Sequence, residues 1–189
     1  MFRNNFFLIM FGLAVLSIAG CEKQEFKQPE SAVNIQPAKI LYTQFSLFQE
    51  DNNFRTTNYR RGTLIPINTA VTLQDKNTDE AKLALVDSGQ TLTIENVPKF
   101  TKDDMTTALG KIIKTSKVDL NQFSQMEKRA ILVGRVQIGM SKKAVLAAIG
   151  YPPQHQTPSL NGDTWTYWSS RTNRFAVIFK QDKVDHIVD

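Results

Sequence analysis

The sequence predicts an α+β protein in which two helices pack on a three-stranded antiparallel sheet, with a small β-rich module before them. Three observations support this fold class. Residues 40–97 contain short alternating apolar segments, residues 101–149 space their apolar residues as helices do, and residues 161–188 alternate again. The predicted divisions of the chain are 1–20, 21–37, 38–100 and 101–189.

Residues 1–20 have the pattern of a secretory signal peptide. A single charge, Arg3, precedes an apolar run that starts at Phe6 and is short for a membrane-spanning helix, which needs about 20 residues. The run ends in the letters IAGC, and this Cys21 is the only cysteine of the chain. The ending resembles a bacterial lipobox, which implies cleavage after Gly20 and lipidation of Cys21. The alternative is an uncleaved anchor, or a conventional signal with a chance cysteine.

Lipidation of Cys21 implies a protein that is tethered to a membrane outside the cytoplasm. A lipidated cysteine leaves no thiol for a disulfide, a metal site or a nucleophile. Residue 22 is Glu, whereas Asp after the lipidated cysteine is the usual inner-membrane retention signal in enteric bacteria. We therefore expect a location in the outer membrane, facing the periplasm. Residues 21–37 are polar and contain two prolines, which predicts a flexible tether.

The charge pattern argues against nucleic-acid binding. The formal net charge is +5, and the basic residues are scattered without interleaved aromatic residues. In an envelope protein such a charge suits anionic lipid headgroups or acidic partner surfaces. An ordinary solvated surface is the alternative. The basic residues considered are Arg60, Arg61, Lys142, Lys143, Arg171 and Arg174.

Residues 38–100 predict a small open barrel or sandwich of four short strands. The segments ILYTQFSLF, GTLIPINTAVTL, KLALVD and TLTIENV are rich in β-branched and aromatic residues, and Asp, Asn and Gly separate them. Gly89 suits the turn between the last two segments. Pro66 lacks an N–H group, which predicts that its strand is bent or lies at a sheet edge.

Two helices are predicted in residues 101–134. In the first, Thr101 is the expected N-cap, with Asp103 and Asp104 in the first turn. In the second, Ser124 is the expected N-cap, and Glu127 stands three residues later as its capping-box partner.

The stretch GRVQIGMSKKAVLAAIGYPP, residues 134–153, has two interpretations. Its glycine spacing is that of a phosphate-binding loop, but Met140 stands where such a loop needs lysine. A helix start explains the residues better: Ser141 is the N-cap, and Met140 packs on Val145 as a hydrophobic staple. Ala144 stands where a capping box would place Glu, so the cap is half built. Gly150 is expected to end the helix in the left-handed conformation.

The last strands form a predicted antiparallel meander from TWTYW, RFAVIFK and KVDHIV. Trp165 and Tyr167 share one face and Trp168 takes the other. One helical layer cannot cover both tryptophans, so one of them must face solvent, the β-rich module or a partner. Tryptophan and tyrosine beside arginine are typical of a protein-binding hot spot. The candidate partner surface comprises Tyr151, His155, Trp165, Tyr167, Trp168, Arg171 and Arg174.

The segments IGMSKKAVLAAIGYPP, DTWTYW and FAVIFKQDKVDHI together resemble the SmpA/OmlA (BamE-like) outer-membrane lipoprotein family. The resemblance covers roughly residues 119–189. It implies a two-helix, three-strand domain and a role near the machinery that assembles β-barrel proteins in the outer membrane. The chain departs from the family pattern in the β-rich module that precedes this domain. The resemblance transfers the fold better than the partner.

No constellation of residues predicts an enzyme. The chain has two histidines, and neither has a neighbour at metal-ligand spacing. His155 lies near Thr157 and Ser159, but a loop histidine that bonds backbone or water is the commoner case. We expect no catalytic residue, metal, cofactor or small-molecule substrate. The predicted function is non-catalytic binding or scaffolding in envelope biogenesis, with β-barrel assembly as the leading role. The alternative is a periplasmic inhibitor or sensor module that binds an enzyme or a cell-wall-associated protein.

Overall fold

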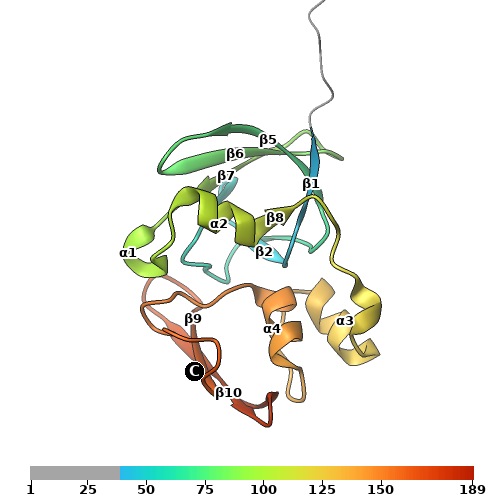
Figure 1. Ribbon diagram of the computed structural model, residues 1–189, viewed down its shortest axis with the longest axis vertical. Coiled ribbons are helices and arrows are strands. Elements are labelled where there is room, and N and C mark those ends of the chain that lie inside the picture. Colours follow the sequence, from blue (N-terminus) through green and yellow to red (C-terminus); the bar gives the residue numbers. More distant parts are fainter. Residues whose placement is uncertain (1–38) are drawn as a thin grey trace, which may run out of the picture. The chain divides into compact units, whose positions relative to one another are not determined.

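The computed structural model describes residues 39–189, drawn as the coloured ribbon in Figure 1. The predicted signal peptide (1–20), Cys21 and the predicted tether (21–37) lie outside the described residues. The fold class is α+β, as predicted, with helices α1 to α4 and several sheets. Within the described range, no helix has both the length and the apolar character that crossing a bilayer requires.

A six-stranded sheet dominates the first half of the described chain. Its order is β3-β7-β6-β5-β1-β8, and all neighbours are antiparallel except the parallel pair β3 and β7. Its apolar face is buried in a core that includes Leu83, Leu92 and Ile94. The strands are β1 (Ile40–Thr43), β3 (Asn53–Arg55), β5 (Ala70–Lys76), β6 (Glu80–Leu85), β7 (Thr91–Glu95) and β8 (Ile113–Lys114).

Two of the predicted strands are each broken into two. The first yields β1 and β2 (Leu47–Gln49), and the second yields β4 (Thr63–Ile65) and β5, with β2 and β4 paired as a separate two-stranded sheet. Pro66 lies at the second break, so the expected interruption there is confirmed. The turn beyond it is held by Thr43, whose hydroxyl donates to the Pro66 carbonyl at 2.9 Å and whose carbonyl accepts from Asn68 N.

The predicted N-cap at Thr101 is wrong. Pro98 begins a separate turn, α1 (Pro98–Thr101), and Lys102 then takes the left-handed conformation and ends it. The longer helix α2 (Met105–Ile112) starts at Asp104, whose side chain accepts from Thr107 N. This bond lowers the pKa of Asp104.

Helix α2 packs on the six-stranded sheet, under the curved hairpin of β5 and β6 in Figure 1. Its apolar residues Met105, Leu109 and Ile112 belong to the same core as the sheet. The chain then leaves the helix directly into β8, which pairs with β1. The boundary predicted at residue 100 thus falls inside a unit of packed elements, and all the described residues belong to one compact unit.

The second half of the chain contains two helices that pack together and a three-stranded antiparallel meander. The helices are α3 (Gln125–Leu132) and α4 (Lys142–Ile149), preceded by a short 3₁₀ helix at Leu120–Gln122, and the sheet order is β11-β10-β9. Their apolar residues share a second core, which includes Ile131, Val145 and Val177. The strands are β9 (Thr164–Trp168), β10 (Arg174–Lys180) and β11 (Lys183–Val188).

One carboxylate, that of Glu127, caps both of these helices. One of its oxygens accepts from the amide and hydroxyl of Ser124, which completes the predicted capping box of α3. The other oxygen accepts from the amide and hydroxyl of Ser141, both at 2.8 Å. Glu127 therefore supplies to α4 the carboxylate that its own sequence lacks at Ala144.

The environment of Glu127 stabilises its ionised form. Burial alone raises the pKa of this carboxyl group, but the hydrogen bonds from Ser141 and Ser124 outweigh burial and lower its pKa to about 2. Glu127 is only 6% exposed. Because the folded pKa lies below the usual 4.5, the stabilisation is complete above pH 4.5 and is lost as the pH falls toward 2.

Gly150 and Phe45 bring the two cores into contact. A β-carbon on Gly150 would lie 2.5 Å from the ring of Phe45, which is itself buried. Gly150 ends α4 with φ of 73° and ψ of −163°. Its φ is positive as expected, but the predicted left-handed helical conformation is wrong, because the chain must extend at this point to enter the next loop. Only glycine adopts this conformation readily.

Replacing Glu127 by Gln is expected to remove the acid-dependent part of the stability. The difference between a pKa of 4.5 and about 2 corresponds to about 3 kcal/mol of unfolding free energy at neutral pH. Urea unfolding at pH 7 and at pH 3 measures it: the wild type loses stability between the two, and E127Q starts lower and changes less. The exposed Glu80→Gln variant serves as control and keeps the wild-type pH dependence. An unchanged pH dependence in E127Q would show that the shared cap is not ionised as described.

Replacing Gly150 by Ala is expected to destabilise the protein by about 2–5 kcal/mol, because the new methyl group overlaps Phe45 in a backbone conformation that alanine resists. Gly110→Ala is the matched control, since this exposed helical glycine has open space around it. Alanine there is expected to raise the free energy of unfolding by up to about 1 kcal/mol. Thermal unfolding should show a lower melting temperature for Gly150→Ala and a slightly higher one for Gly110→Ala. Equal effects would contradict the close approach at Gly150.

Candidate partner-binding site

Trp165 and Tyr167 were predicted to lie on the partner surface, but the structure buries both. Both side chains are fully buried in the core of the second half, with 1% and 0% of their area exposed. The Tyr167 hydroxyl donates to the Gly150 carbonyl at 3.0 Å, and burial raises its pKa well above 10. The Trp165 ring meets Phe179 edge-on at 4.7 Å. The prediction was wrong for these two residues because strand alternation turns both of them to the helical layer.

Trp168 points to the opposite face of β9 and packs against two aromatic rings from the first half of the chain and against the His155 ring from the loop after α4. Its ring lies 6.4 Å from Tyr59, 6.2 Å from Phe100 and 6.0 Å from His155, measured between centroids. Of the three environments expected for the second tryptophan, packing on the β-rich part is therefore observed. The Trp168 side chain stays half-buried, so part of the residue also remains accessible.

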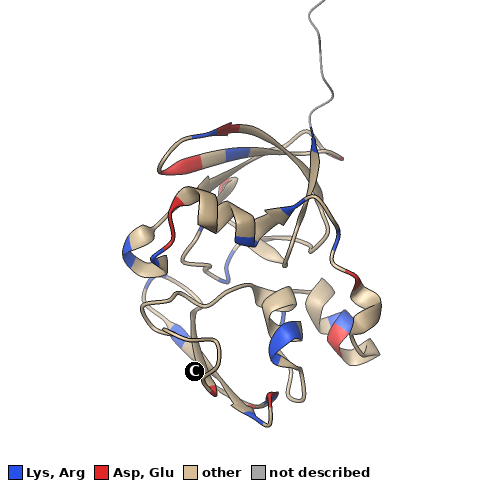
Figure 2. Cartoon of the chain, in the orientation of Figure 1, with Lys and Arg blue, Asp and Glu red and all other residues tan. Residues whose placement is uncertain are grey.

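Basic side chains surround this aromatic cluster. The Arg174 guanidinium lies 5.0 Å from the centre of the Trp168 ring, and the Lys99 ammonium lies 5.6 Å from that of Phe100. Arg174 is exposed, as is Arg171. In Figure 2 part of α1, which carries Lys99, has the blue of lysine and arginine. We name this region the Trp168 surface and define it by Tyr59, Phe100, His155, Trp168, Arg171 and Arg174.

A cavity of about 400 Å³ opens into the Trp168 surface. Arg55 and Thr57 complete its lining. Arg55 Nε, Thr57 Oγ1 and Trp168 Nε1 are buried and have no hydrogen-bond partner among residues 39–189. Two of these are N–H donors and the third is a hydroxyl, so the residues that line this cavity favour an oxygen acceptor as their missing partner.

His155 joins the loop after α4 to α1. Its backbone amide donates to the Phe100 carbonyl at 3.0 Å, and Nδ1 lies 3.2 Å from the same oxygen. Its ring lies 4.9 Å from that of Phe100. Thr157, which the sequence placed near it, instead uses its hydroxyl to accept from Thr166 N. These contacts give His155 a packing and positioning role in the Trp168 surface.

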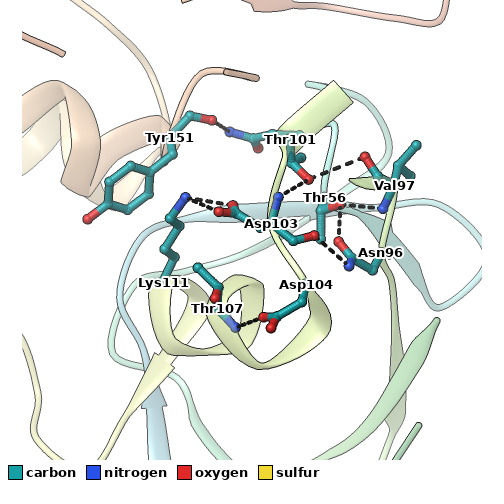
Figure 3. Close-up of polar contacts among 10 residues, drawn as sticks. Thr56, Asn96, Val97, Thr101, Asp103, Asp104, Thr107, Lys111 and Tyr151 are labelled. Carbon is teal, nitrogen blue, oxygen red and sulfur yellow. Dashed lines mark hydrogen bonds and ion pairs between the residues drawn. The ribbon is translucent and has the colours of Figure 1, made fainter. Parts of the chain in front are cut away.

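Tyr151 lies apart from the Trp168 surface, at a second cavity of about 290 Å³. The Lys111 ammonium lies 5.4 Å from the centre of the Tyr151 ring and donates to both oxygens of Asp103, at 2.8 and 2.6 Å. Figure 3 shows this ion pair beside Tyr151. We name this space the Tyr151 cavity.

Hydrogen bonds fix the polar wall of the Tyr151 cavity (Figure 3). The Thr56 hydroxyl donates to Asn96 Oδ1 and accepts from Val97 N. Asn96 Nδ2 donates in turn to the Asp103 carbonyl at 3.0 Å. This chain of bonds connects β3 to the start of α2 and holds Asp103 in position for Lys111.

Within residues 39–189, no three His, Cys, Asp or Glu side chains lie together as a metal site requires. His186 is exposed on β11, and its Nδ1 lies 2.9 Å from a carboxylate oxygen of the neighbouring Asp185. The arrangement of the Trp168 surface, with flat rings and cations, suits binding.

The chain was compared with protein-family models, with curated proteins and with solved structures, and no significant match was found in any of the three.

Sequence reasoning missed four residues that complete the Trp168 surface and its cavity. Tyr59 and Phe100 supply rings, and Arg55 and Thr57 supply polar atoms. All four come from the first half of the chain: Arg55 ends the short strand β3, Thr57 and Tyr59 follow it in a loop, and Phe100 lies in α1. The one available signal was the excess of aromatic residues on β9. It predicted that a second surface packs against this strand, but it did not identify the residues of that surface.

The two tryptophans are expected to differ in fluorescence quenching. Trp165 is buried, whereas Trp168 is half-buried beside Arg171 and Arg174, whose charge attracts anions. Iodide should quench the wild type more strongly than caesium does. Trp168→Phe should leave a blue-shifted emission that iodide hardly quenches, and Trp165→Phe is the control that retains the quenching. Strong iodide quenching in Trp168→Phe would contradict this placement.

Proposed function

We propose that this protein is a lipid-anchored, periplasm-facing binding protein of the outer membrane, which acts without catalysis in envelope biogenesis. Its leading role is to hold a partner protein, with the β-barrel assembly machinery as the leading candidate. The anchor is the lipidated Cys21. The observation that carries the proposal is the Trp168 surface, where partly exposed aromatic rings are bordered by Arg171 and Arg174.

The proposal also concerns the fold of the second half of the chain. We infer a BamE-like domain over roughly residues 119–189. The order α3, α4, β9, β10, β11 supports it, as does the α3–α4 contact. Residues of the segment IGMSKKAVLAAIGYPP, which carries part of the resemblance, fit this interpretation as well. Met140 and Val145 are fully buried together in the second core, and Ser141 caps α4. The six-stranded sheet before this domain adds an element beyond the two-helix, three-strand pattern.

The charge of the Trp168 surface favours an acidic partner. Arg171 and Arg174 are exposed. Arg55 contributes a further cation to the lining, although its charge is paired with Glu95 at 2.7 Å. Partly exposed aromatic rings at the centre and cations at the rim match the usual anatomy of a protein interface. A partner that presents acidic side chains around an apolar centre would complement both features.

Site-specific photocrosslinking in intact cells tests the partner. A photoreactive residue in place of Arg171 is expected to capture one envelope protein in stoichiometric amounts, and the same residue in place of Val86, an exposed position on the β6–β7 connection, serves as control. Arg174→Glu should reduce the capture at least tenfold, whereas Arg129→Glu on the exposed face of α3 should not. Capture of a barrel-assembly component supports the leading role. Capture of a periplasmic enzyme or a cell-wall-associated protein supports the inhibitor or sensor alternative, and equal capture at both positions contradicts the proposed site.

Replacing Cys21 by Ala is expected to release the protein from the membrane, because acyl chains that contribute about 0.8 kcal/mol for each buried methylene are then missing. Fractionation of cells into soluble and membrane pools measures the effect, and Ser17→Ala in the same predicted signal is the control. A C21A protein that remains in the membrane fraction would contradict the lipid anchor while leaving the Trp168 surface open to the crosslinking test.

A further inference from the structure

The three-stranded sheet has an inner and an outer face. The inner face shares a core with α3 and α4 through Trp165, Val177 and Phe179. Because side chains alternate along a strand, the residues between these point the other way. We name that side the outer face, and none of its residues is buried. It consists of Thr164, Thr166 and Trp168 from β9, Arg174, Ala176, Ile178 and Lys180 from β10, and His186 and Val188 from β11, which the strand register places side by side.

The middle of the outer face is apolar and accessible. Ala176 pairs there with Val188, which is 49% exposed, and Ile178 follows two residues later on β10. The six-stranded sheet turns a different kind of face to solvent, where Lys82 on β6 pairs with Thr93 on β7. Polar residues are the rule on the side of an antiparallel sheet that meets water. An apolar centre in that position indicates a surface that binds another molecule.

Basic side chains lie at both ends of this apolar centre. Arg174 stands at one end, beside Trp168, and Lys180 stands at the other, about 20 Å further along the same strand. Both side chains are exposed, and the described part of the chain offers neither of them an ion-pair partner. The Arg174 guanidinium donates to the uncharged Gln156 amide at 3.3 Å, so its charge remains available to a partner.

Three acidic side chains near the outer face already have partners. A carboxylate oxygen of Asp185 lies 2.9 Å from His186 Nδ1, and the Lys142 ammonium pairs with Asp163 and Asp182 at 3.3 and 2.9 Å. Positive charge is therefore in excess at both ends of the outer face. Acidic groups on a partner would complement it.

The dimensions of the outer face match those of one α-helix. Neighbouring strands lie about 4.8 Å apart, so the axes of the outer two of three strands are about 10 Å apart, close to the diameter of a helix. The distance of about 20 Å from Arg174 to Lys180 corresponds to about 13 residues of helix at 1.5 Å each. The rings of Trp168 and Phe100 close one end of this strip.

We propose that the outer face binds an amphipathic helix of the partner protein. The helix lies along the strands with its apolar stripe on Ala176, Ile178 and Val188, and it carries acidic residues about 13 positions apart for Arg174 and Lys180. This inference rests on the proposed function, because Trp168 and Arg174 belong to both surfaces and the helix extends the contact of the same partner. A partner that touches the Trp168 surface alone is the alternative.

Photocrosslinking in intact cells from the Val188 position tests the inference. A photoreactive residue there is expected to capture the same envelope protein that the Arg171 position captures, whereas one in place of the exposed Lys82 should capture none. Mass spectrometry should place the crosslink in a segment that has apolar residues at helical spacing and acidic residues about 13 positions apart.

The two positions separate the inference from the proposed function. Capture from the Arg171 position but not from the Val188 position would overturn the inference and leave the proposed function standing, as would a crosslinked segment without the expected pattern. Capture from the Val188 position alone would support the outer face and contradict the Trp168 surface as a contact. Capture from neither position would overturn both.

A synthetic peptide of the crosslinked segment provides the second test. Its circular dichroism is expected to gain helical signal when it binds the full-length protein. Lys180→Glu should weaken this binding roughly tenfold, because a repulsion replaces an attraction. Lys82→Glu makes the same charge change on the solvated face of the other sheet and should bind as the wild type does. A peptide that binds without gaining helical signal, or equal affinities of the two variants, would overturn the proposal.

Discussion

The Trp168 surface and the Tyr151 cavity both depend on the packing of one short segment, Thr57–Arg60, against the second half of the chain. Asn58 bonds to the carbonyls at the end of α4, and Tyr59 packs on Trp168. Arg60 donates to the Gly134 carbonyl at 2.6 Å and lies over the Phe48 ring. Burial lowers the pKa of Arg60 to about 10, which still leaves it charged at neutral pH. The segment thus combines a buried amide, a ring and a half-buried cation, and it contributes to the walls of both sites.

The end of α4 must be equally well placed for these contacts to form. Glu127 sets where α4 begins, because its carboxylate binds the caps of both helices. Gly150 sets where α4 ends, since its missing side chain lets Phe45 approach. The loop before α4 also pairs with β11, through Gly139 N to the Val184 carbonyl and Val184 N to the Met140 carbonyl. Helix α4 is therefore held at both ends by groups that are distant in sequence.

The sequence predicted what local chemistry determines and missed what distant contacts determine. The caps at Ser124 and Ser141 were predicted because a hydroxyl before an apolar helical run bonds to amides in its own turn. The opposite faces of Trp165 and Trp168 follow from strand alternation alone. The predicted helix cap at Thr101 is wrong because Pro98 starts a separate turn that ends there, and the cap of the longer helix is Asp104. The role of Glu127 at α4, the partners of Trp168 and the Tyr151 cavity all require contacts between residues more than ten positions apart, which periodicity does not encode.

A single loop, residues 151–160, contributes to both sites. His155 packs against Trp168 and Phe100 on one side, while Tyr151, Pro152 and Thr157 line the Tyr151 cavity. Two hydrogen bonds hold the loop in place, from Asn58 Nδ2 to the Tyr151 carbonyl and from His155 N to the Phe100 carbonyl. Because Asn58 and Phe100 belong to the first half of the chain, any movement of the two halves relative to each other changes both sites together. Energetic coupling between the two sites through this loop therefore requires that these hydrogen bonds stretch or break.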